Sequence, residues 1–214
     1  MPENSIRWPT LIEALALSAL IGVYIWKLQP THPGAGWFLG LWFVVSIFVH
    51  HDTPKTLGWR GDNLLAATWQ GMPVLITFLA LTFIAAAFFG AYHKMPGHFT
   101  DIRRFLKYGS FCLLQQVALN SYLTNRLVAA NLPLKSACLL SGIVFGALHW
   151  PNPVLVPLTF VGGVVMAWLF IRERNIIPLT VGQAILGALV WWALPMAWHH
   201  GMRVGPGFYT FHLH

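Results

Sequence analysis

Long apolar segments separated by short polar connections dominate this sequence. A helix that crosses a bilayer needs about 20 mainly apolar residues, with some latitude. Only 9% of the residues are charged and 57% are hydrophobic, whereas a typical soluble domain carries about 25% charged residues. No chain of alternating segments indicates a membrane β-barrel. The sequence therefore predicts an all-α, polytopic transmembrane helix bundle.

The apolar segments predict about seven spans, within a range of about six to eight, in one membrane domain over residues 1–214. The candidate spans are Leu11–Trp26, Trp37–Val49, Met72–Tyr92, Ser110–Leu127, Ser136–His149, Val154–Phe170 and Ile176–Trp198. No site typical of signal-peptide cleavage follows the first segment, so we expect it to remain as a helix. The stretch Thr100–Tyr108 predicts an amphipathic helix at the membrane interface, with apolar and basic residues on opposite sides.

The formal charge of +7 comes mainly from basic residues assigned to the connections, Arg126 among them. Lipid head groups account for such a distribution, so we expect no nucleic-acid partner. The basic residues divide almost evenly between the two sets of connections, which leaves the orientation open. Of the six acidic residues, only Glu13 lies within an apolar run. Cys112 and Cys138 lie in apolar stretches and predict packing rather than a disulfide.

Three polar clusters interrupt the apolar runs. The stretch LLQQVALN, residues 113–120, contains Gln115, Gln116 and Asn120, and residues four apart share one face of a helix. His149 ends the sequence GIVFGALH, and Gln183 lies in PLTVGQAILG. Because the clusters lie on different predicted helices, we expect them to converge in the bundle. The alternative is that each side chain separately joins two helices through a hydrogen bond.

The clusters together resemble the motifs of the CAAX-protease and bacteriocin-processing family of membrane peptidases, also called the CPBP or Abi family. That family has a Glu-Glu-x-x-x-Arg helix, then Phe-x-x-x-His, then His-x-x-x-Asn or Asp. Here Phe145 and His149 match the second motif, and the Pro151-Asn152-Pro153 that follows is a common continuation in bacterial members. The loop TLGWRGDN, residues 56–63, also resembles a family loop, so the expected family-like core is about 56–189.

The other motif positions depart from the family pattern. Gln115 and Gln116 stand where the family has glutamates, and Asn120 stands where it has arginine. Gln183 replaces the third-motif histidine, and Gly187 replaces its Asn or Asp partner. In the family, a glutamate is taken to activate water while the histidines help to position it, directly or through a metal. A glutamine amide cannot accept that proton, although it keeps hydrogen-bonding capacity.

The resemblance and its departures imply a catalytically degenerate homologue. It would retain a cavity within the membrane for a peptide or lipid segment, or serve as a partner protein, in a bacterial inner membrane. We expect no cofactor, since one histidine among neutral amides is a poor zinc site. One alternative is an active peptidase with a divergent site centred on His149. Another is a metal- or cofactor-binding membrane protein, suggested by ten histidines, including His199, His200, His212 and His214.

Overall fold

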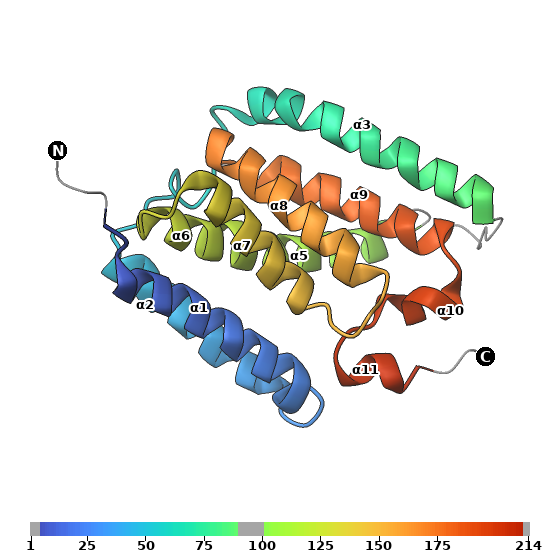
Figure 1. Cartoon of the computed structure of the whole chain (residues 1–214), viewed down its shortest axis with the longest axis horizontal. Helices are drawn as coiled ribbons and strands as arrows, with labels where there is room; N and C mark the ends of the chain where they lie inside the picture. Colours follow the sequence, from blue (N-terminus) through green and yellow to red (C-terminus); the bar gives the residue numbers. More distant parts are fainter. Residues whose placement is uncertain (1–4, 90–100, 212–214) are drawn as a thin grey trace.

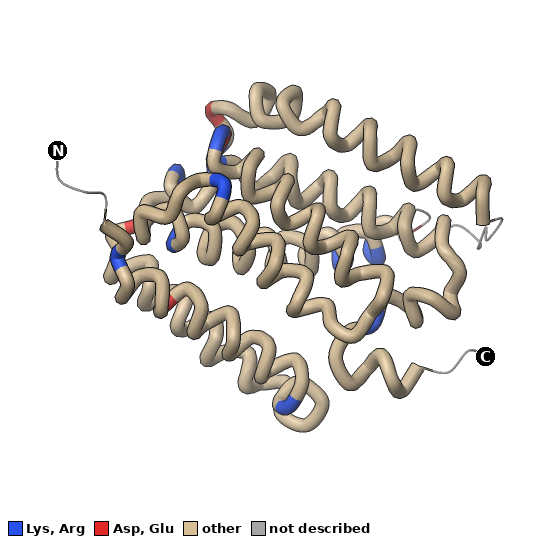
Figure 2. Tube along the Cα trace, in the orientation of Figure 1, with Lys and Arg blue, Asp and Glu red and all other residues tan. Residues whose placement is uncertain are grey.

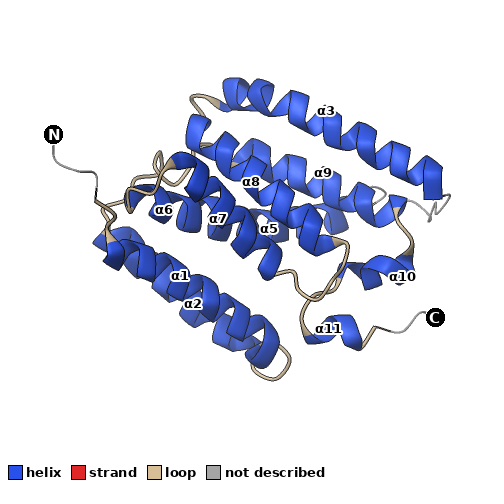
Figure 3. Cartoon of the chain, viewed as in Figure 1, coloured by secondary structure: helices blue, strands red, loops and turns tan. Residues whose placement is uncertain are grey.

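The structure, a computed structural model, describes residues 5–89 and 101–211 of the chain. Within those ranges every regular element is a helix and no strand occurs (Figure 3). Some predicted features reach residues outside this description: the end of the third span at Tyr92, Thr100, and the terminal His212 and His214. The predicted all-α membrane bundle is confirmed.

Each predicted span coincides with a helical segment. Their bounds are α1 Trp8–Val23 with η1 Tyr24–Leu28, η2 Pro33–Ala35 with α2 Gly36–Val49, α3 Leu64–Phe89, α5 Ile102–Gln116 with η3 Val117–Thr124 and α6 Asn125–Ala129, α7 Leu134–Ala147, α8 Leu155–Glu173 and α9 Ile177–Ala193. By length and composition, three helices in the described chain are able to cross a membrane: Trp8–Leu28, Leu64–Phe89 and Leu155–Glu173. Three shorter apolar helices accompany them: Pro33–Val49, Leu134–Ala147 and Ile177–Ala193.

The predicted interfacial helix is not a separate element. From Ile102 the chain runs as one helix, α5, to Gln116, and the side chain of Asp101 caps its start by accepting a 2.9 Å hydrogen bond from the Arg103 amide. The helix then continues as the π-helix η3 from Val117 to Thr124. The basic residues Arg103, Arg104 and Lys107 therefore lie on the same helix as Gln115 and Gln116.

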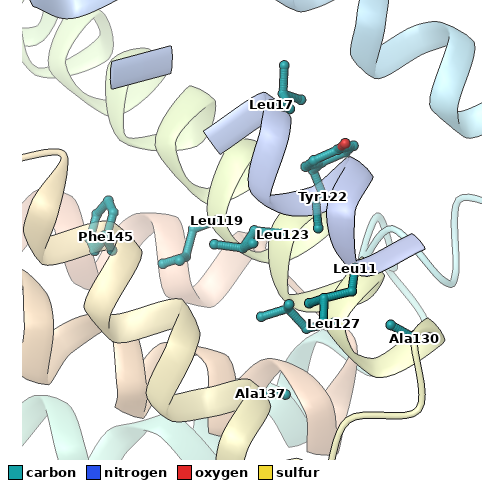
Figure 4. Packing of buried hydrophobic residues seen from close by; sticks show 10 residues of the cluster. Leu11, Leu17, Leu119, Tyr122, Leu123, Leu127, Ala130, Ala137 and Phe145 are labelled. Carbon is teal, nitrogen blue, oxygen red and sulfur yellow. The ribbon is translucent and has the colours of Figure 1, made fainter. Parts of the chain in front are cut away.

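The segment η3 lies at the centre of the bundle, in contact with α1, α7 and α8. Figure 1 shows α3, α8 and α9 on one side of the molecule and the α1–α2 hairpin on the other. The largest apolar core joins α1, η3, α6 and α7 (Figure 4). Its buried residues include Leu11, Leu17, Leu119, Tyr122, Leu123, Leu127, Ala130, Ala137 and Phe145.

Helices α7 and α8 approach most closely because glycines line their contact. A Cβ at Gly142 would lie 2.6 Å from the Phe160 carbonyl oxygen, and a Cβ at Gly163 would lie 2.9 Å from the Gly142 Cα. Gly146 faces the same helix one turn later, where its Cβ would meet Phe160 at 3.1 Å. Small residues allow such close helix approach within membranes, where lipid removes the usual hydrophobic drive.

A buried ionic network attaches the α1–α2 hairpin to α6. Arg126 is only 1% exposed and donates to the Asp52 carboxylate and, at 3.0 Å, to the Ser46 hydroxyl. The Glu13 carboxylate accepts from Ser46 at 2.5 Å and lies 2.7 Å from the His50 Nε2. The assignment of Arg126 to a surface connection was therefore wrong, because paired carboxylates make its burial possible.

The C-terminal segment folds back on the bundle through α10 Met196–His199, η4 His200–Met202 and α11 Pro206–Tyr209. Asn152, which is fully buried, donates to the carbonyls of His199 and Arg203 at 2.7 and 3.0 Å. Its side-chain oxygen accepts from the amides of Val154 and Leu155 at the start of α8. One asparagine thus caps α8 and anchors the tail beside His149.

Candidate functional site

The polar positions singled out in the sequence lie together in the bundle. Gln115 and Gln116 end α5, His149 lies in the turn after α7, and Gln183 lies in the second turn of α9. These residues are up to 68 positions apart in the chain, yet their side chains make direct contacts. The convergence expected from the motif order is therefore present.

Three glutamine amides form the centre of the cluster. Gln183 donates to the Gln115 side-chain oxygen, and Gln116 donates to the Gln183 oxygen at 2.6 Å. The Gln116 amide nitrogen also lies 2.8 Å from the Met166 sulfur. Each glutamine therefore has a neutral partner, and the cluster contains no carboxylate.

A second layer continues the network into the core. Asn120 donates to the Gln116 oxygen at 2.6 Å and accepts from the Thr124 hydroxyl at 3.1 Å. The Thr124 and Ser141 hydroxyls are 2.9 Å apart, which joins η3 to α7. Gln116, Asn120, Thr124 and Ser141 are all fully buried. Satisfied buried amides of this kind specify how helices pack against each other.

His149 has a defined orientation within the cluster. Its Nδ1 lies 2.6 Å from the Phe145 carbonyl oxygen, which can only accept, so Nδ1 carries the proton and donates. In the neutral ring, Nε2 is then an acceptor, and it faces the Gln115 amide nitrogen at 3.5 Å. The partner that orients the imidazole is thus a backbone carbonyl rather than a carboxylate.

An apolar cavity of about 680 Å³ opens beside the cluster. Its walls come from α3, α5, α8 and α9 together with the segment after α10. Gln115, His149 and Gln183 lie on its lining, whereas Gln116 and Asn120 lie behind it. This volume is within the range of roughly 300–1,000 Å³ that is usual for small-molecule sites.

Residues 111–189 match the family described as "Type II CAAX prenyl endopeptidase Rce1-like". The resemblance to CAAX-type membrane peptidases is confirmed. The match contains all three polar clusters and Gly187, while residues 56–110 of the expected core lie outside it. No curated protein and no solved structure matches the chain. The chain is thus a CAAX-protease-like, integral membrane protein with several apolar helices.

Tyr108 lies against Gly187 and limits the size of the side chain at that position. A Cβ at Gly187 would overlap the Tyr108 hydroxyl, so a larger side chain there requires the Tyr108 ring to move. Tyr108 lies on α5, before the matched segment, and it lines the cavity. Gly187 and Tyr108 therefore belong to one packing contact between α9 and α5.

The side chains of Gln115, Gln116, His149 and Gln183 do not fit the ligand set of a zinc ion. Zinc sites use three or four His, Cys or carboxylate ligands, and His149 has only amides beside it. Across residues 5–89 and 101–211, no group of three or more His, Cys, Asp and Glu is placed to hold a metal. His199 and His200 lie in the folded tail and do not join the cluster; His199 is buried near the Leu194 carbonyl.

Sequence reasoning missed several residues that complete the site. Thr124 and Ser141 extend the network, Met166 contacts Gln116, and Tyr108 fills the space at Gly187. Thr124 lies four residues after Asn120, so helical periodicity alone places it on the same face. The positions of Tyr108 and Met166 relative to the glutamines depend on how α5, α8 and α9 pack, which no local pattern encodes.

Proposed function

We propose that this chain is a non-hydrolytic relative of the CAAX-type peptidases that holds an apolar chain in its cavity. The observation that carries the proposal is the hydrogen bonding of Gln115, Gln116 and Gln183 to one another. An amide has no basic lone pair that can take a proton from water near neutral pH. The positions of the family's water-activating groups therefore serve as a structural network.

The cavity lining supports an apolar occupant. Thr68, Thr82 and Thr159 all lie on the lining, and each donates its hydroxyl to a carbonyl of its own helix. These hydroxyls therefore have no proton left to donate to a ligand. A peptide backbone in the membrane needs partners for its N–H and C=O groups, whereas a lipid chain needs none. We thus favour the chain of a lipid or lipidated molecule over a bare peptide.

The setting of the protein is part of the same proposal. We infer an inner-membrane location in a bacterium, because the Pro151-Asn152-Pro153 continuation is common in bacterial members of the family. Fractionation of cells expressing the native protein tests this location. Recovery with the outer membrane would contradict it.

Restoration of the family motifs tests the loss of chemistry. The variant Gln115→Glu, Gln116→Glu, Asn120→Arg and Gln183→His is compared with the natural chain on a prenylated peptide substrate. We expect no cleavage by the natural chain. Cleavage by the natural chain that persists through repurification and disappears in His149→Ala would overturn the proposal.

Cleavage by the natural chain that is lost in His149→Ala would support the alternative function, a peptidase centred on His149. The observation in its favour is the unprotonated Nε2, which lies on the cavity lining and can accept a proton. One observation argues against it: in the described part of the chain, the His149 ring hydrogen-bonds to the Phe145 carbonyl and faces the Gln115 amide, and neither group is a carboxylate. The imidazolium formed in such a step would lack the partner that stabilises it.

A further inference from the structure

Two basic residues near the start of α5, Arg104 and Lys107, lie at one end of the cavity. Tyr108, Phe111 and Gln115 lie on the cavity lining, at spacings of three and four residues that define one face of the helix. Four residues before Tyr108, Arg104 continues that face beyond the lining, and Lys107 stands four residues before Phe111. Both basic side chains are exposed. Arg104 lies about 17 Å along the helix axis from Gln115, at a rise of 1.5 Å per residue.

The charge at this end is available to a ligand. Arg104 has an ion pair with Asp101 at 3.6 Å, but the two side chains are 68% and 44% exposed, and such surface pairs contribute little. Arg203, in the C-terminal segment, is exposed but does not lie on the lining, because its guanidinium lies over the Phe211 ring, 5.2 Å from the ring centroid. The basic end therefore consists of Arg104 and Lys107, and Figure 2 shows basic positions at the start of α5.

We propose that the cavity binds an anionic glycerophospholipid, with one acyl chain between α3, α8 and α9 and the phosphate at Arg104 and Lys107. The inference rests on the proposed function, since it requires that the cavity hold an apolar chain. A phosphate carried on such a chain matches the two parts of the site, the apolar lining and the exposed basic residues at its end. Basic residues at the membrane surface attract anionic lipids, and the cavity converts this attraction into a site for one molecule.

Titration of lipids against the purified, delipidated protein tests the proposal, with bound lipid counted by native mass spectrometry. The probes are phosphatidylglycerol and phosphatidylcholine with the same acyl chains. We expect phosphatidylglycerol to bind more tightly to the natural chain. The variant Arg104→Gln/Lys107→Gln should lose at least about fivefold in affinity for phosphatidylglycerol and keep its affinity for phosphatidylcholine. Lys27→Gln, in η1 and outside the cavity lining, should leave both unchanged.

Cavity-filling variants separate the inference from the proposed function. A Cβ at Gly71 meets no atom within 4 Å and one at Gly182 meets only Leu75 at 4.0 Å, and both glycines lie on the lining. Gly71→Leu and Gly182→Leu should therefore fill the cavity and reduce the binding of both lipids. Gly40→Leu, at an equally open position on α2, is the matched control.

Each remaining outcome has one meaning. Equal binding of the two lipids, lost in Gly182→Leu and Gly71→Leu, would overturn the anionic site and leave the apolar cavity in place. Selective binding of phosphatidylglycerol that both cavity variants retain would show a surface attraction only, and would overturn the inference. Tighter binding of a farnesylated peptide with a free carboxylate than of phosphatidylglycerol would assign the basic end to a lipidated peptide and also overturn it.

Discussion

The Gln116 amide donates a 2.6 Å hydrogen bond to the Gln183 side-chain oxygen, which joins α5 to α9 across 67 residues of sequence. Both side chains stand at motif positions where CAAX-type peptidases carry titratable groups. In this chain the bond is neutral, and Gln116 receives a second bond from Asn120. These two positions form a contact between helices, and the contribution of that contact to stability can be measured.

Substitution Gln116→Leu is expected to lower the stability of the folded protein. It removes the donor to Gln183 and the acceptor of Asn120, which is fully buried, so a polar group is left unsatisfied. Such a loss costs about 1–3 kcal/mol. Denaturant unfolding in mixed micelles measures it, with Gln29→Leu, an exposed position in the turn after η1, as the control. Equal stability of the two variants would argue against a structural network.

Tyr108 is expected to decide whether the third motif can be rebuilt. Gly187→Asn alone should destabilise the protein, because the new side chain overlaps the Tyr108 hydroxyl. Adding Tyr108→Ala should recover most of the lost thermal stability. A double variant no more stable than Gly187→Asn alone would show that the clash lies elsewhere. Thermal denaturation of the two variants and of Tyr108→Ala completes a double-mutant cycle.

Arg126→Met should be strongly destabilising, by about 3–5 kcal/mol, because it leaves the carboxylates of Asp52 and Glu13 without their buried cation. Lys135→Met, at an exposed position at the start of α7, is the control. The triple variant Arg126→Met/Asp52→Asn/Glu13→Gln should be more stable than the single variant. If it is less stable, unpaired charge is not the cause of the loss.

The glycine contact between α7 and α8 predicts different effects for two small changes. Gly142→Ala places a methyl group 2.6 Å from the Phe160 carbonyl oxygen, so the helices must separate. Gly162→Ala, on α8, meets only the Met166 methyl at 3.7 Å, an ordinary contact. We expect Gly142→Ala to lower the midpoint of thermal unfolding and Gly162→Ala to leave it within a few degrees. Similar midpoints would contradict the close packing.

Asp62 should titrate well below its ordinary range. The hydrogen bond from Arg60, aided by the charge of that guanidinium, lowers the pKa of the Asp62 carboxyl from 3.8 to about 2. Any stability from this pair is therefore present above about pH 4 and is lost as the pH falls through the lowered value. NMR titration of the Asp62 carboxyl measures the pKa, and Arg60→Gln should return it towards 3.8. An ordinary pKa in the natural chain would contradict the contact.

The sequence by itself determined the class of fold and four members of the polar cluster that lie close together, Gln115, Gln116, His149 and Gln183, besides Asn120. Apolar runs with few charges leave only a helical membrane bundle, because a bilayer does not satisfy an open backbone. The spacing of Gln116 and Asn120 placed them on one helical face, and the order of motifs placed His149 and Gln183 opposite. The first inference succeeded because helical periodicity is a local property, and the second because the motif order resembles that of a family with a shared fold.

Only the tertiary structure decided which groups partner each other. Arg126 reads as one more loop cation until α6 packs against the α1–α2 hairpin and places Asp52, Ser46 and Glu13 around it. Tyr108 is part of a predicted interfacial helix until α5 packs against α9 and the Tyr108 hydroxyl takes the space at Gly187. Gly142 and Gly146 lie four residues apart, and only the packed bundle shows that they face α8. Contacts of this kind depend on the distances between helices, and packing over the whole bundle sets those distances.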